Sequence, residues 1–567
     1  MVSKKGSKKS SARSSQTPAQ PGSNTSTGAY EKLINRMYEP LVLLHALDPI
    51  RGDHIATTNP PINNAQHIRR QFRDDLAFLC EYDKGGDACT ALGIEDREDC
   101  LIYWVAANAN PQKKIEPFLV NLLGDLAAVI REGGGTDTST GTARLQTATE
   151  EVTAKCAAFA LPKIKKICTL LRIRISDCEE CLGGGSFSDE EKQLAVWLQQ
   201  FKQSTKDISA AGAGLDLCRL AYDRRKSREM RQLKQLALEQ GHHGVSRQCF
   251  AQAHHYIGRL ADHVRVPPRL VSNLQYVEDL LLNPLSVQVP PMAHCAPCEP
   301  LRQEHGKRQS RLEGIISRMC KPHEKALLAE LAAGLQDFSQ NYDLDAIVHK
   351  KFADLTEKSK APRVHAEVQI LEHFHRNKLD WADNGDRYIG CSKPACFCCH
   401  LYFRHHPLRP VMPGTHNKVY PKWGPPLLDG GTANPGYIEQ RDLLNRFIED
   451  VRKDVVEQIR AKRGPSKRWQ ADTATAITQT VAGDFDGVVH VGDDSGFESS
   501  DFGDYTLDNS RSDDNSSSMN DADPTPVEDL SRDLVYLDLS SYPDADSDSD
   551  PEDGGVDVRE WSSPGIS

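Results

Sequence analysis

The sequence predicts a multidomain α+β protein in which a large all-α region precedes a smaller layered α/β domain, with disordered segments at both ends. Three observations lead to this prediction. The chain has 567 residues, which corresponds to two to four domains. Its hydrophobic content is 38%, below the roughly 45–50% of compact domains. Near residue 340 the spacing of apolar residues changes from a helical pattern to short strand-like segments.

The N-terminal segment, residues 1–28, is predicted to be a disordered basic tail. It is rich in Ser and Lys and contains no acidic residue. Such a composition buries too little apolar surface to offset the entropy of ordering the chain.

Residues 29–335 are predicted to be helical. Apolar residues recur at i, i+3, i+4 and i+7 in the segments 110–132, 190–203, 214–240 and 323–338, as in helices with one buried face. Ser188 and Glu191 have the spacing of a capping box. Two roles for this region stay open, namely recognition of a substrate or protein partner, and service as a scaffold.

Residues 340–465 alternate between short strands and helices. Strands are predicted at 345–352, 387–391 and 416–420 and in the stretch that ends at Val364, and helices at 366–377, 396–406 and 437–462. This alternation indicates a layered α/β domain.

Residues 471–567 are predicted to be a disordered acidic tail. This segment contains 25 acidic residues, 3 Arg and no Lys, so residues 1–470 carry a net charge of +11 although the whole chain carries −11. A basic body favours a polyanion such as single-stranded nucleic acid as a partner. The tail either solubilises the protein or binds a protein partner.

Neither a membrane segment nor a secretory signal is predicted. The best apolar stretch, 119–130, is short and contains Asp125, whereas a membrane helix needs about 20 apolar residues. The 16 cysteines are therefore expected to be reduced thiols of an intracellular protein, in the cytoplasm or the nucleus. Four of them lie between Cys391 and Cys399, and clustered cysteines are candidates for metal binding or catalysis.

The candidate metal ligands are His365, Cys396 and Cys399. The two cysteines are three residues apart at the start of a predicted helix, so their thiols lie on one face near a helix N-terminus that favours thiolates. His365 begins a different predicted helix. Three protein ligands with an open fourth position are typical of catalytic zinc. Glu367 would take a proton from the activated water and pass it to a leaving group, which for a base ring amounts to hydrolytic deamination.

The motifs HAE at 365–367 and PACFCC at 394–399 are close to the H-x-E and P-C-x-x-C signature of zinc-dependent base deaminases, with Ala395 as one additional residue. The longer segments HAEVQILEHF, YIGCSKPACFCCHLYFRHHP and GTHNKVYPKWGPP resemble the OTT-type deaminase family, a fungal and bacterial branch of the cytidine deaminase-like superfamily. The resemblance covers roughly residues 340–430. It implies a three-layer α/β/α fold and a zinc-dependent deaminase of cytosine or adenine in nucleic acid or a nucleotide. His365, Cys396 and Cys399 would then bind zinc, and Glu367 would be the proton shuttle.

Two alternatives stay open on the sequence. In the first, Cys391 joins His365, Cys396 and Cys399 in a closed structural zinc site, within a non-catalytic interaction protein that carries a deaminase-like domain. In the second, no metal binds and the cysteines are small core residues.

Two aromatic residues downstream of the cysteines are candidates for substrate binding. His416 and Trp423 lie near turns marked by Gly414 and Pro425. Imidazole and indole rings beside a deaminase pocket are suited to stacking on a base.

Overall fold

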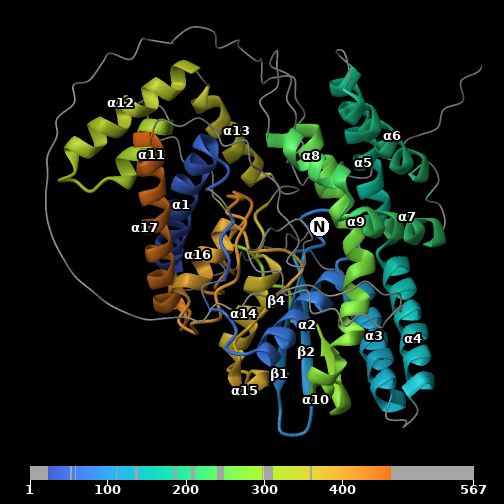
Figure 1. Cartoon of the computed structure of the whole chain (residues 1–567). Helices are drawn as coiled ribbons and strands as arrows, with labels where there is room; N and C mark the ends of the chain where they lie inside the picture. Colours follow the sequence, from blue (N-terminus) through green and yellow to red (C-terminus); the bar gives the residue numbers. More distant parts are fainter. Residues whose placement is uncertain are drawn as a thin grey trace, which may run out of the picture. The chain divides into compact units, whose positions relative to one another are not determined.

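A computed structural model describes residues 23–461, with gaps at 52–53, 58, 110–111, 134–137, 184–187, 206–207, 209–210, 239–247, 297, 299–310, 342 and 358–360 (Figure 1). The predicted acidic tail lies outside the described residues, as do residues 1–22 of the predicted basic tail. The remainder of the predicted basic tail belongs to the first helix, which begins at Ser23. The described residues all belong to one compact unit.

The described residues form a helix-rich fold with one small mixed sheet. The α-helices are α1 (Ser23–Leu47), α2 (Asn64–Cys80), α3 (Gln112–Gly133), α4 (Thr138–Phe159), α5 (Leu161–Gly183), α6 (Asp189–Ser204), α7 (Ala211–Arg224), α8 (Arg228–Leu238), α9 (Gln248–Ser272), α10 (Glu278–Leu282), α11 (Arg311–Met319), α12 (Lys325–Asn341), α13 (Leu344–Thr356), α14 (Ala366–Asn377), α15 (Ala382–Gly385), α16 (Phe397–His405) and α17 (Tyr437–Ala461). The strands are β1 (Thr90–Asp96), β2 (Leu101–Ala107), β3 (Leu285–Gln288) and β4 (Gly390–Cys391), and two short 3-10 helices are η2 (Leu274–Tyr276) and η4 (Gly431–Ala433).

The central element of the fold is a sheet with the strand order β3-β2-β1-β4. β1 and β2 form an antiparallel hairpin, β3 lies parallel to β2, and β4 is antiparallel to β1. The prediction of an all-α region at 29–335 is therefore wrong, because β1, β2 and β3 fall inside it. The two long strands are almost wholly buried, and a continuously buried apolar run shows no alternation that separates a strand from a helix.

The strands predicted within 340–465 are mostly absent from the described structure. Residues 345–352 form part of α13, which Asp343 caps by accepting a hydrogen bond from the Ala346 backbone N–H at 3.0 Å. The predicted strand at 387–391 shrinks to the two residues of β4, which pair with β1 through Ala91 and Cys391. The segments at 416–420 and before Val364 make isolated bridges only. The sheet beside α14 therefore takes its long strands from the N-terminal half of the chain.

The helix predictions are confirmed more closely. α14, α16 and α17 match the predicted segments 366–377, 396–406 and 437–462 to within one residue at each end. α6 begins with the predicted capping box of Ser188 and Glu191. The predicted helix at 214–240 is divided into α7 and α8.

Both faces of the β1–β2 hairpin are covered, as Figure 1 shows for α2 and α14. One face packs in a core with α2 and α3, and the other packs in a core with α14 and α16. Two glycines allow the close approach of these helices. A Cβ at Gly93 would lie 2.8 Å from Cγ2 of Ile370 on α14, and a Cβ at Gly390 would overlap the backbone of Arg73 on α2. The hairpin is thus packed closely against α14, whose N-cap residue is His365.

A further hydrophobic core joins the helices α5 to α9. α9 packs against α5 and α7 as well as α2, so it connects this core to the sheet. Among the described helices, none combines the length and the apolar character that crossing a bilayer requires.

A buried charge network connects these helices to the loop that precedes Cys396. Glu81, at the C-cap of α2, is fully buried and accepts a hydrogen bond from Nζ of the fully buried Lys163 at 3.2 Å. Nζ of Lys393 lies 3.1 Å from the other carboxylate oxygen, and a guanidinium nitrogen of Arg259 lies 4.0 Å from it. Burial by itself would raise the pKa of Glu81, but the neighbouring cations lower it to about 2.

Replacement of Glu81 by Gln is expected to lower the free energy of unfolding by about 3–5 kcal/mol, because Lys163 would stay buried without a counter-charge. Urea titration of the full chain measures this loss. The matched control is Glu150→Gln, which removes an exposed partner of Arg219 and should change the stability little. An equal small effect of both substitutions would contradict the network.

The lowered pKa of Glu81 also predicts how the free energy of unfolding changes in acid. Because the folded pKa of about 2 lies below the ordinary value of 4.5, the ionised Glu81 stabilises the fold above pH 4.5. That stabilisation is lost as the pH falls from 4.5 toward 2. The free energy of unfolding should therefore fall more steeply over this range in the natural protein than in Glu81→Gln. Equal slopes for the two proteins would contradict this assignment.

Candidate metal centre and active site

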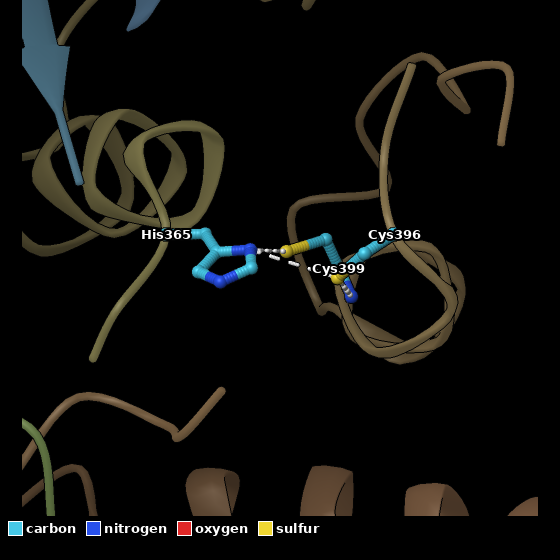
Figure 2. Close-up of side chains that lie close together, drawn as sticks. All are labelled: His365, Cys396 and Cys399. Atoms are coloured by element: carbon cyan, nitrogen blue, oxygen red, sulfur yellow. Dashed lines mark hydrogen bonds between the residues drawn. The ribbon is translucent and has the colours of Figure 1, made fainter. Parts of the chain in front are cut away.

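Two helix N-termini carry the candidate ligands toward a common point. His365 is the N-cap of α14, with φ −69° and ψ 154°, and Cys396 is the N-cap of α16, with φ −74° and ψ 167°. Extended backbone at an N-cap projects the side chain ahead of the helix. Figure 2 shows the His365 ring from the start of α14 facing the thiols of Cys396 and Cys399 from the start of α16.

The donor atoms are spaced as a tetrahedral zinc ion requires. Nδ1 of His365 lies 3.6 Å from Sγ of Cys396 and 3.4 Å from Sγ of Cys399. Zinc bonds of about 2.3 Å to sulfur and 2.0–2.1 Å to nitrogen at tetrahedral angles give a nitrogen–sulfur separation of about 3.5 Å. All three donors lie within 4.8 Å of one another, and within the described ranges no other group of three His, Cys, Asp or Glu side chains does so.

The electrostatics of the thiols also fit a bound cation. Burial would raise the pKa of Cys396, but hydrogen bonds from the Cys398 and Cys399 thiols and the charge of His365 lower it well below its ordinary value. The pKa of Cys399 is raised well above its ordinary value by burial and by the neighbouring Cys396. The protein alone therefore favours one thiolate. A second thiolate in this buried pair needs a cation, and zinc prefers thiolate and imidazole ligands.

The closed alternative with Cys391 is not the arrangement in the structure. Cys391 lies in β4, and its thiol donates to the carbonyl oxygen of Ile389 at 3.5 Å. It is not part of the three-donor group, and burial raises its pKa well above the ordinary value. The donor set is thus one imidazole and two thiols, and Cys391 is not among them.

Glu367 lies in the first turn of α14, two residues beyond His365. It is half-buried, whereas Cys396 and Cys399 are buried. Burial raises the pKa of Glu367, and the charge of His365 opposes that rise. A carboxyl with a raised pKa beside the metal ligands is suited to accepting a proton and returning it.

The two candidate substrate-binding residues lie in different environments. Trp423 is fully buried, stacks on Phe447 at a centroid distance of 5.3 Å and makes an edge contact with Tyr402. It therefore packs in the core. His416 is also buried, but its backbone N–H donates to the carbonyl oxygen of Ala395, next to Cys396. Burial lowers the pKa of His416 to about 3, so its ring is neutral.

Two residues that hold the start of α14 carry no recognisable signal in the sequence. Asn108, just after β2, accepts a hydrogen bond from the Ala366 backbone N–H at 2.7 Å. Gln369 donates from Nε2 to the carbonyl oxygens of Ala107 and Val364 at 3.0 and 2.9 Å. No local motif marks Asn108, because it lies 258 residues before its partner.

Comparison with protein families assigns the segment that contains these residues. A family model described as OTT_1508_deam-like deaminase matches residues 364–427. This segment, which holds His365, Glu367, Cys396 and Cys399, is similar to that deaminase family. No curated protein matches the chain. No solved structure matches it either.

The geometry predicts a definite metal content. The purified full chain should contain one zinc ion, with two sulfur ligands and one nitrogen ligand from the protein, as measured by metal analysis and zinc-edge X-ray absorption. Cys396→Ser should lose most of this zinc, because a ligand is removed. Cys391→Ser is the matched control and should retain it. A third sulfur around the zinc, or loss of zinc from Cys391→Ser, would favour the closed site.

Proposed function

We propose that this protein is a zinc-dependent hydrolytic deaminase of a nucleobase, with its site at the N-termini of α14 and α16. The observation that carries this proposal is the cluster of His365, Cys396 and Cys399 with the half-buried Glu367 beside it. The deaminase family match over residues 364–427 supports it. A three-ligand donor set is typical of catalytic zinc, which keeps a position open for water.

The metal ligands and Glu367 would have separate roles in the reaction. Zinc bound by the three donors would supply an activated water. The carboxylate of Glu367 would take a proton from that water and deliver it to the amino nitrogen that leaves the ring. The reaction consumes one water, replaces the exocyclic amino group with oxygen and releases ammonia. His365 and the two thiolates would hold their positions throughout, because both helix starts are fixed by hydrogen bonds.

The proposed substrate is cytosine or adenine in single-stranded nucleic acid or a nucleotide. The net charge of +11 over residues 1–470 supports an anionic substrate. Lys393 and Lys418 lie near enough to His416 to contribute to its lowered pKa, so positive charge is present beside the candidate site. The neutral imidazole of His416 is the remaining candidate for contact with the base.

The proposed architecture has three layers. The β1–β2 hairpin would be the middle layer, with α2 and α3 on one face and α14 and α16 on the other, as the two cores on its faces suggest. Under this proposal the α5–α9 core is an addition outside the three layers. It is a candidate surface for a protein partner, as is the acidic C-terminal segment.

Glu367→Gln tests the proposed mechanism. The amide keeps the shape of the side chain but accepts no proton, so turnover should fall by about 10²–10⁴-fold while zinc content stays unchanged. Ammonia release and base-resolved mass spectrometry on cytosine- and adenine-containing oligonucleotides and nucleotides measure this. Glu439→Gln, at an exposed partner of His375, is the control and should leave turnover unchanged. Full activity in Glu367→Gln would overturn the mechanism, and a zinc-loaded natural protein inactive on all of these substrates would favour a non-catalytic role.

A further inference from the structure

The helix that presents His365 does not use its own N-cap side chain as a cap. An N-cap residue ordinarily accepts a hydrogen bond from an N–H of the first helical turn through a side-chain oxygen. His365 occupies the N-cap of α14 and makes no such bond. Its Nδ1 faces the thiols of Cys396 and Cys399 instead. The first N–H groups of α14 therefore need a partner from elsewhere in the chain.

Asn108 supplies that partner. Its Oδ1 accepts the Ala366 N–H at 2.7 Å, and its Nδ2 donates to the carbonyl oxygen of Gly86 at 2.7 Å. The backbone N–H of Asn108 donates to the carbonyl oxygen of Cys89 at 3.1 Å. The carboxamide is thus held at both ends, with its oxygen toward the helix, because one neighbour is a donor and the other is an acceptor.

A second contact joins the same two elements. The buried Gln369 donates to the carbonyl oxygen of Ala107, next to Asn108, and to that of Val364, next to His365. The peptide units on both sides of His365 are therefore tied to the end of β2. This leaves the imidazole as the free part of the residue.

The second ligand-bearing helix is capped differently. Sγ of Cys396 accepts the backbone N–H of Cys399 at 3.4 Å, so α16 is capped by a residue that is also a candidate ligand. A sulfur can accept an N–H and bind a metal together, because it has several lone pairs. A neutral imidazole has a single acceptor nitrogen, and in His365 this nitrogen faces the two thiols.

We infer that Asn108 is a positioning residue of the metal centre, which caps α14 from 258 residues away so that His365 is free to bind the metal. This inference rests on the candidate zinc centre of the proposed function but not on its deaminase activity. The cap fixes the peptide between His365 and Ala366, and so the direction in which the imidazole leaves the backbone. It also fixes the first turn that carries Glu367.

The test compares two asparagine caps in the full chain. Asn108→Ala removes the cap of α14. Asn63→Ala removes the cap of α2, where Asn63 accepts the Gln66 N–H at 2.8 Å far from the ligands in sequence. Both substitutions should lower the melting temperature, because each removes a helix cap. Zinc affinity is measured by competition with a chromophoric chelator.

Asn108→Ala should bind zinc about 10–100-fold more weakly than the natural protein, as expected when a residue that orients a metal ligand is lost. Asn63→Ala should bind zinc with unchanged affinity. Asn108→Asp keeps an oxygen that accepts the Ala366 N–H and should bind zinc more tightly than Asn108→Ala. The visible spectrum of the cobalt-substituted protein should change in Asn108→Ala and not in Asn63→Ala.

Equal zinc affinity and equal cobalt spectra in the natural protein and Asn108→Ala would overturn the inference. So would equal weakening by Asn63→Ala, because the effect would then be general destabilisation. If Asn108→Ala does not fold, Asn108→Asp is compared with the natural protein instead. A loss of zinc affinity in Asn108→Asp as large as that expected for Asn108→Ala would count against the cap. A natural protein that binds zinc without deaminating any base would overturn the proposed function and leave this inference standing.

Discussion

The structure depends on one constraint, namely that two helix N-termini must face each other with their donor atoms about 3.5 Å apart. The imidazole comes from α14 and the thiols from α16, and 31 residues separate His365 from Cys396. Neither helix fixes this distance by itself. The β1–β2 hairpin fixes the position of α14, because α14 packs on it at Gly93 and is tied to its end by Asn108 and Gln369. α16 packs in turn against α14 and α17.

Charge reinforces the same arrangement. The loop that leads to Cys396 contains Lys393, which is anchored on the buried Glu81 together with Lys163 from α5. A buried carboxylate is stable only with its cations, so the loop and the α5–α9 core hold each other in place. At the candidate ligands, the neighbouring groups lower the pKa of Cys396, whereas burial and Cys396 raise that of Cys399. The cluster of one imidazole and two thiols is compatible with a bound metal cation.

Much of the site could be predicted from the sequence, and less of the fold. The spacing of His365, Glu367, Cys396 and Cys399 is local, and the starts of α14 and α16 follow from apolar periodicity and short-range caps. The strands were harder to predict. Residues 345–352 contain a short apolar run, Ala346–Val348, but form a helix capped by Asp343. The strands of the hairpin, β1 and β2, are buried almost throughout and show no alternation of buried and exposed residues. Trp423, next to a turn in the sequence, is a core residue because Tyr402 and Phe447 enclose it.

The sequence by itself determined the chemical identity of the site, since ligand types and their spacing are properties of short segments. Only the tertiary structure decided which cysteines gather with His365, that Cys391 stays in β4 away from them, and that Asn108 caps α14. The physical reason is the range of the interactions. Helix periodicity and capping act over a few residues, whereas strand pairing and the cap from Asn108 join residues hundreds of positions apart, and no local pattern records such a partner.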